Sequence, residues 1–495
     1  MKIIRFVVIS VSVVILSGCK QIPDGTTLMK RMENYLAAGN FAGIQILTDS
    51  IKKIYPGEKQ LIIKADSLSQ IAQRIAIDFS VPENIFISQL NESVGNFSAE
   101  ELQSWENRNW LEWKMINGEK KYFRRAASNL RLIRNFNLER TYYDSLNSVE
   151  PEILLRKSNI SSIIQTSDDQ HNPALPVNMV INYSIIVKPD AVPEGEIIRC
   201  WLPYPKEDKI RQQNIKFISA SHENYRIAPD SVTHRTIYME AKSMRGVPLV
   251  FSVSYSYQSS GQYFDPDKIK ILPYDRNSDL YKKYTAEQLP DICFTENIRH
   301  ITDSITGSEE KPFEILKKIY YWIDENIPWA GSLEYSTMPN IPEYVLRNRR
   351  GDCGMQTFLL MSMLRYKGIP VRWQSGWMMP PENENLHDWC EVYFEGPGWI
   401  PVDMSYGLQY SCDRKIREFY ISGIDSYRLI INDGVAGSLF PAKKFLRSEP
   451  LDFQRGEVEW SGGNVYFNKW EYNMKIEYLT KKRTPARKPE LQLSE

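Results

Sequence analysis

The spacing of apolar residues changes twice along this 495-residue chain, and these changes limit the folds that it can adopt. From about residue 26 to 150 apolar side chains recur at helical spacing, and Ser98 followed by Glu101 has the spacing of a helix-start capping box. From 177 to 262 four β-branched and aromatic runs are separated by turn residues, which predicts an antiparallel β-sandwich. From 286 onward helical and strand-like runs alternate. The sequence therefore predicts an α+β protein of several domains.

Domain boundaries follow from these changes and from two composition signals. Residues 158–176 are polar and contain two prolines, which favours a linker, and Gly462-Gly463 favours a hairpin turn. The predicted segments are a signal peptide (1–18), a helical domain (19–157), the linker (158–176), a β-sandwich domain (177–262), a mixed α/β domain (286–450), a C-terminal β-hairpin packed on the core (451–480) and a disordered tail (481–495).

The first twenty residues have the pattern of a targeting segment. Lys2 and Arg5 precede an apolar run over residues 6–16, which is too short to span a bilayer stably. The sequence "LSGC", which ends at Cys19, resembles the bacterial lipoprotein cleavage box, in which the cysteine becomes the lipidated first residue. We therefore expect a protein of the bacterial cell envelope, anchored by lipid at the outer membrane or the periplasmic face. A plain secretory signal with a chance cysteine is the alternative.

Charge and cysteine usage exclude several classes of function. Lys+Arg and Asp+Glu are both 61, so the net charge of zero gives no attraction to nucleic acid. The six cysteines include no C-x-x-C pair, which argues against a zinc site and a disulfide framework. With Cys19 committed to lipid, five remain, and at least one thiol stays free unless chains cross-link. No metal and no cofactor is predicted.

One cysteine, Cys353, lies between glycines at the start of an apolar helical run over residues 353–368. Unpaired backbone N–H groups at a helix start favour a thiolate and can stabilise an oxyanion. Gly351 and Gly354 leave room for an acyl group bound to the sulfur. A buried structural cysteine is equally compatible with this local sequence.

A nucleophilic thiolate needs a base, and the base needs an orienting partner. Of five histidines, His300 and His387 share the predicted domain of Cys353, and His387 opens a strand-like run. Strand alternation then places Cys390 on the face opposite His387, as a core residue. Asp403 lies on the next strand-like run, and neighbouring strands are close enough for its carboxylate to reach the imidazole.

The ordered set "GDC" ending at Cys353, "HDW" starting at His387 and "GWIPVD" ending at Asp403 resembles the core of the transglutaminase-like superfamily, a distant relative of the papain-like fold. The resemblance covers roughly residues 310–410, and the preceding β-rich region resembles a β-domain seen in many bacterial members. It implies that Cys353 is the nucleophile, His387 the general base and acid, and Asp403 the orienting residue. It leaves the oxyanion donor open between Trp329 and Tyr335.

The shared chemistry of that family is thiol attack on an amide carbonyl. The resemblance therefore implies an enzyme that acts on a peptide, protein or glycopeptide, with hydrolysis favoured over amine-transfer cross-linking because water is plentiful in the envelope. The alternative is a catalytically silent lipoprotein that binds or scaffolds a peptide or glycan. A redox sensor is disfavoured because no resolving cysteine lies near Cys353 in sequence. The substrate and the oligomeric state are not predicted.

Overall fold

The computed structural model describes residues 24–145 and 151–479, so the predicted signal peptide, Cys19 and the predicted tail lie outside the described residues. The chain divides into two compact units: one comprises the residues up to Gln73 together with Met115–Glu119, and the other comprises the remainder. The predicted helical domain 19–157 is therefore wrong as a single body, because its part beyond Gln73 belongs mostly to the second unit. No helix among residues 24–145 and 151–479 is long and apolar enough to cross a membrane.

The first unit is a small helical body. Helices α1 (Gly25–Ala37) and α2 (Phe41–Ile54) begin at Asp24 and Asn40, whose side chains accept backbone N–H groups. With the first part of α3 (Lys59–Asp78) they bury an apolar core of Leu28, Met32, Ile44, Ile51, Ala65 and Ala72. Gly39 between α1 and α2 has a φ of +71°, and a Cβ there would lie 1.8 Å from a backbone oxygen.

The second unit begins with short helices and strands. Ser98 forms the predicted capping box with Glu101 at the start of α5. The predicted linker 158–176 is wrong for most of its length, because residues 158–166 belong to a helix with buried Ile160 and Ile163, and a strand begins at Ala174. The elements are β1 (Val81–Pro82), α4 (Glu83–Val94), α5 (Ala99–Asn107), α6 (Ala126–Ser145) and α7 (Pro151–Thr166), while β2 (Trp113–Ile116) and β3 (Glu119–Tyr122) have residues in both units.

The predicted β-sandwich is present as two five-stranded antiparallel sheets. One has the order β13-β9-β4-β17 with β6 paired to β9, and the other has the order β16-β15-β5-β8-β7. Alternate residues of β4 from Met179 to Val187 are buried in the shared core, and Cys200 of β5 is also fully buried, as predicted. The strands of the first part are β4 (Ala174–Val187), β5 (Ile197–Pro203), β6 (Gln212–Ala220), β7 (Arg226–Ile227), β8 (Thr236–Lys242) and β9 (Leu249–Tyr263).

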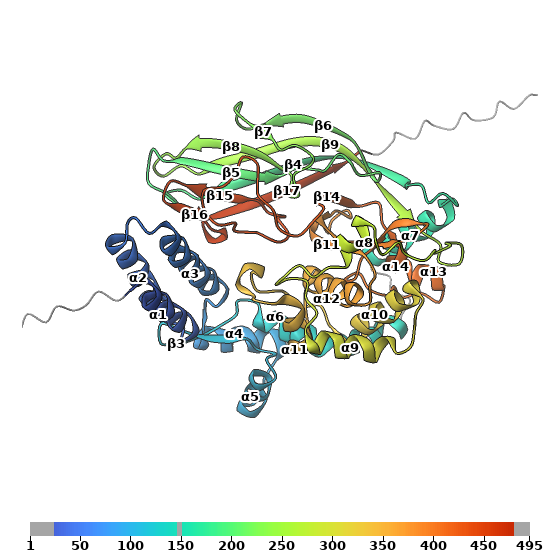
Figure 1. The fold of residues 1–495 in the computed structure, drawn as a ribbon, viewed down its shortest axis with the longest axis horizontal. Helices are drawn as coiled ribbons and strands as arrows, with labels where there is room; N and C mark the ends of the chain where they lie inside the picture. Colours follow the sequence, from blue (N-terminus) through green and yellow to red (C-terminus); the bar gives the residue numbers. More distant parts are fainter. Residues whose placement is uncertain (1–23, 146–150, 480–495) are drawn as a thin grey trace, which may run out of the picture. The chain divides into compact units, whose positions relative to one another are not determined.

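The C-terminal segment completes this sandwich. The predicted hairpin exists, because β15 (Glu457–Trp460) pairs with β16 (Gly463–Val465). Beyond it β17 (Trp470–Tyr478) pairs with β4 along its whole length, and Figure 1 shows this red strand beside the green ones. The sandwich is therefore not confined to residues 177–262, because the C-terminal strands β15 and β17 pair with β5 and β4, which lie far earlier in the sequence.

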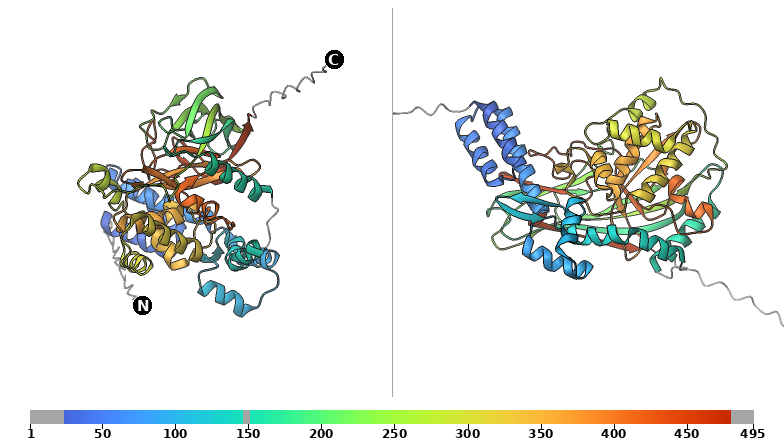
Figure 2. Two further views of the ribbon diagram at one scale, coloured as in Figure 1. Left: turned by 90° about the vertical axis from the view of Figure 1, so that its right-hand side faces the viewer. Right: turned by 90° about the horizontal axis from the view of Figure 1, so that it is seen from below.

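The remaining elements surround a four-stranded antiparallel sheet of order β12-β11-β10-β14. Its strands are β10 (Val371–Met378), β11 (Asn385–Phe394), β12 (Gly398–Val402) and β14 (Arg428–Asn432), and β13 (Gly423–Ile424) joins the sandwich. Figure 2, right, shows the yellow and orange helices of this region grouped together. They are α8 (Asp279–Thr285), α9 (Glu296–Thr306), α10 (Pro312–Asn326), α11 (Ile341–Asn348) and α12 (Cys353–Tyr366), followed by the short α13 (Arg414–Arg417) and α14 (Phe419–Ser422).

Candidate active site

Cys353 is the first residue of α12, as the sequence predicts. The Asp352 side chain caps this helix by accepting the Met355 N–H, and it also accepts a hydrogen bond from the Tyr335 hydroxyl. From Gly354 on, almost the whole helix is buried, so its start is fixed in position. A Cβ on Gly354 would lie 2.3 Å from the Tyr335 hydroxyl, so glycine is required for this close approach.

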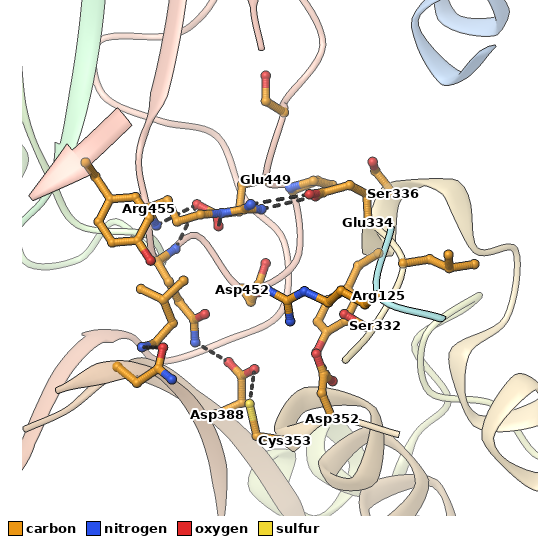
Figure 3. A pocket seen from close by; sticks show the side chains of 18 of the residues that line it. Arg125, Ser332, Glu334, Ser336, Asp352, Cys353, Asp388, Glu449, Asp452 and Arg455 are labelled. Carbon is orange, nitrogen blue, oxygen red and sulfur yellow. Dashed lines mark hydrogen bonds and ion pairs between the residues drawn. The ribbon is translucent and has the colours of Figure 1, made fainter. Parts of the chain in front are cut away.

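The Cys353 thiol contacts a carboxylate. Its Sγ donates to Asp388 Oδ2 at 3.4 Å, as Figure 3 shows. Burial, and after it the neighbouring carboxylates of Asp388 and Asp352, raise the pKa of the Cys353 thiol well above its ordinary value. The expectation that the helix start favours a thiolate is therefore wrong for this state, because desolvation and two acidic neighbours outweigh the backbone N–H groups.

His387 and Asp403 meet as predicted. His387 Nε2 lies 2.7 Å from Asp403 Oδ2, and both side chains are buried. Arg428 Nη1 lies 2.8 Å from the same carboxylate oxygen, and Arg428 Nη2 lies 2.6 Å from Asp425. The charges of His387 and Arg428 hold the pKa of Asp403 below its ordinary value despite its burial. Asp403 therefore remains ionised and can orient the imidazole.

The three residues implied by the resemblance are not joined in one hydrogen-bonded chain. Among the described residues, the thiol of Cys353 is bonded to Asp388, and no hydrogen bond links it to His387. Because successive residues of β11 point to opposite faces, Asp388 turns toward Cys353 while His387 turns toward Asp403. Asp403 contacts Nε2, so Nδ1 is the imidazole nitrogen that this contact leaves free.

A cavity of about 340 Å³ opens beside Cys353. Five carboxylates and three guanidinium groups are among its lining residues: Glu334, Asp352, Asp388, Glu449, Asp452, Arg124, Arg125 and Arg455. Figure 3 shows Arg455 extended between Glu449 and Glu334 on one side of this space, with Asp388 and Cys353 on the other. Small-molecule sites are concave and carry a few such convergent polar groups, so this cavity is the candidate substrate site.

The structure separates the two oxyanion candidates. Both residues line the cavity, but the Tyr335 hydroxyl donates to Asp352, whereas Trp329 is 44% exposed. Gln454, which sequence reasoning missed, donates from Nε2 to Asp388 Oδ1 at 2.7 Å and to the His387 backbone oxygen at 2.8 Å. Gln454 therefore fixes both neighbours on β11, and no motif in the sequence marks it.

Replacing Asp388 by asparagine is expected to lower the pKa of the Cys353 thiol, because a neighbouring carboxylate disfavours the thiolate and an amide does not. The pH of half-maximal alkylation by iodoacetamide should fall in Asp388→Asn, as followed by mass mapping of the Cys353 peptide. Exposed Cys412 is the internal reference and should keep its profile. An unchanged or higher midpoint at Cys353 would show that Asp388 does not suppress the thiolate.

Comparisons with known proteins bear on this region. Residues 299–404 match a family model described as the transglutaminase-like superfamily. A curated relative, the uncharacterized protein YebA of Bacillus subtilis, is 23% identical over 177 residues. That alignment covers 31% of this chain and 24% of YebA, so it spans about a quarter of the length of that relative.

Two solved structures show similarity at low identity. A "putative cysteine protease" of Cytophaga hutchinsonii has a TM-score of 0.44 and 13% identity, covering 64% of this chain and 95% of that one. The periplasmic domain of TgpA from Pseudomonas aeruginosa has a TM-score of 0.25 and 18% identity, covering 51% of this chain and 76% of that one. On the family match, residues 299–404, which include Cys353, His387 and Asp403, form a domain of the transglutaminase-like superfamily.

Proposed function

We propose that this protein is a thiol enzyme that attacks amide bonds, with Cys353 as nucleophile, His387 as general base and acid, and Asp403 as the residue that orients the imidazole. The observation that carries the proposal is the buried His387–Asp403 pair at 2.7 Å, one residue along β11 from the carboxylate that contacts Cys353. Nucleophilic catalysis by a thiol requires an oriented imidazole that the thiol can reach, and the His387–Asp403 pair supplies the oriented imidazole.

The structure gives no hydrogen bond between Cys353 and His387, so catalysis requires the thiol to leave Asp388 and reach His387, to whose Nδ1 it then donates its proton. The sulfur then attacks the amide carbonyl, and backbone N–H groups at the start of α12 stabilise the oxyanion. His387 returns the proton to the leaving nitrogen, so an amine departs and a thioester remains on Cys353. His387 next takes a proton from water, which attacks the thioester and releases a carboxylic acid and the thiol.

Hydrolysis is proposed in preference to amine transfer because an amine acceptor must displace water from the thioester. The cavity beside Cys353 is open and lined with charged groups, which keep it hydrated. The substrate is an amide in a peptide, protein or glycopeptide.

A catalytically silent binding protein is the second candidate, and one observation favours it. The thiol is held protonated by burial and by two carboxylates, and this state is unreactive. In that case the cavity binds a peptide or glycan without turnover.

A substrate screen separates these functions. Purified residues 20–495 are incubated with quenched peptides and amide-bearing glycopeptides, with and without a fluorescent primary amine, and Cys353→Ala is the matched control. The proposed enzyme produces free acid in the wild type alone, whereas amine transfer incorporates the fluorophore. Binding without turnover, equal in both proteins, would establish the silent alternative.

We also propose that Cys19 carries a lipid that anchors the chain in the bacterial envelope. Radioactive palmitate added to expressing cells is expected to label the wild type and a Cys412→Ala control, but not Cys19→Ala. Equal incorporation into Cys19→Ala would refute the anchor.

A further inference from the structure

We propose that the cavity beside Cys353 selects amide substrates that carry a positively charged primary amine close to the scissile carbonyl, held by the carboxylates of Asp388 and Asp452. This selection rests on the proposed function, since it assigns the substrate class of the same site. It goes beyond that function because nothing in the Cys–His–Asp chemistry requires a charged substrate.

The charges that line the cavity do not balance. Arg455 already forms ion pairs with Glu449 and Glu334, at 2.7 and 3.1 Å. Arg124 also forms an ion pair, because its Nε lies 3.3 Å from the carboxylate of buried Asp78. The charges that remain are the three aspartates at positions 352, 388 and 452 and the single guanidinium of Arg125. An excess of negative charge in a cavity attracts a cation.

Asp452 and Ser448 are polar side chains of the cavity without partners, and this indicates a ligand independently of the charge imbalance. The Asp452 carboxylate makes no hydrogen bond or ion pair with any residue that the structure describes, and Figure 3 shows it in the same space as Arg125 and Asp388. Ser448, which is only 2% exposed, lines the same cavity, and its hydroxyl has no partner within the described ranges. A buried polar group without a partner is costly, so the Ser448 hydroxyl lacks a partner that a ligand can supply, and the partly exposed Asp452 carboxylate is a second acceptor in the same cavity.

A primary ammonium fits these acceptors. It offers three N–H donors and no acceptor, which matches two carboxylates and one hydroxyl, whereas a guanidinium is planar and favours a bidentate partner. Because Asp388 also contacts Sγ at 3.4 Å, an ammonium bound there lies close to the reacting carbon. The bound cation would also offset the repulsion that keeps Cys353 protonated, so binding and thiol activation are coupled.

The pH dependence of this selection has a definite sign. Burial and neighbouring carboxylates raise the pKa values of Asp388 and Asp452 well above the ordinary range. The charged and titratable groups that face these two carboxyls include Glu334, Glu449, Asp352, Arg125, Arg455 and the Cys353 thiol. Raised carboxyl groups become charged only as pH increases, so the preference for a cation should increase with pH.

Charged thiol reagents test the selection without needing turnover. Aminoethyl methanethiosulfonate is cationic and sulfonatoethyl methanethiosulfonate is anionic, and each attaches a two-carbon group to a thiol as a disulfide. Among the described cysteines, Cys353 is partly exposed and Cys412 is exposed, while the other three are buried. The ratio of cationic to anionic labelling rates at Cys353, divided by the same ratio at Cys412, cancels reagent reactivity. Peptide mass mapping measures both rates.

We expect this normalised ratio to exceed unity by about tenfold or more, and to increase with pH. Asp452→Asn and Asp388→Asn should each lower it several-fold, while Asp169→Asn, at an 83% exposed side chain, leaves it unchanged. Either aspartate variant suffices if the other fails to fold. A ratio at or below unity, or one that both variants leave unchanged, would overturn the proposal. Because labelling requires no catalysis, a failed substrate screen with a high ratio would refute the enzyme alone.

Discussion

Cys353→Ala and His387→Ala are each expected to abolish amide turnover as completely as the double variant. Residues that act as one catalytic unit are strongly non-additive, and loss of the nucleophile or its base costs roughly 10⁵- to 10⁶-fold in rate. Turnover is measured on a peptide or glycopeptide found in the substrate screen, with denaturation midpoints to confirm folding. If the two single losses multiplied in the double variant, the residues would be acting independently.

Asp403→Asn and Cys390→Ala complete this set. Asp403→Asn keeps the shape of the side chain but removes the charge that orients His387, so it should lower the rate by less, about 10²- to 10⁴-fold.

Cys390 is fully buried, so Cys390→Ala should lower the free energy of unfolding, on the order of 1 kcal/mol, and leave turnover intact. A large loss of rate in Cys390→Ala would mean that the wrong cysteine had been assigned.

The second large effect concerns stability. Arg428→Met is expected to lower the free energy of unfolding by about 3–5 kcal/mol, because it leaves the carboxylates of Asp403 and Asp425 buried without their cation. Urea denaturation followed by tryptophan fluorescence measures the loss. The control, Arg245→Met, changes an exposed arginine and should stay within about 0.5 kcal/mol of the wild type.

The pH dependence of this loss tests its cause. With Arg428 present, the pKa values of Asp403 and Asp425 are held below the ordinary range, so their contribution to stability is full above the unfolded carboxyl pKa and is lost as pH falls through the folded values. Without the cation, burial raises the pKa of both carboxyls with less opposition, since His387 is then the charged neighbour that still lowers the pKa of Asp403. The destabilisation by Arg428→Met should therefore be larger at neutral pH than near pH 4. A pH-independent loss would point to lost packing instead.

Much of the site's framework could be predicted because it depends on local sequence. The helix from Cys353 to Tyr366, the strand that carries His387 and the strand that ends just before Asp403 follow from apolar spacing and from the glycine and proline residues at their ends. The meeting of His387 with Asp403 follows from strand pairing, in which Cys390 lies opposite Val402. The separation of His387 from Cys390 follows from strand alternation alone.

The other contacts of the site could not be predicted, because they depend on packing between segments that are distant in sequence. Alternation along β11 puts Asp388 and His387 on opposite faces, but only the docking of α12 decides that Asp388 meets Cys353. Arg428 and Gln454 reach the site from later parts of the chain, and neither belongs to a motif. The part of α7 from residue 158 on escaped prediction because it buries only Ile160 and Ile163, which is too weak a pattern to distinguish from a linker.

The most direct test of the central claim is acid-quench mass spectrometry of purified residues 20–495 mixed with a turned-over amide substrate. Intact mass and peptide mapping would follow the acyl group. The mechanism predicts a thioester on the Cys353 peptide, with the mass of the acyl part of the substrate, which forms far more slowly in His387→Ala and is absent from Cys353→Ala. Turnover that persists at the wild-type rate in Cys353→Ala, or an acyl group carried by any other residue, would contradict it.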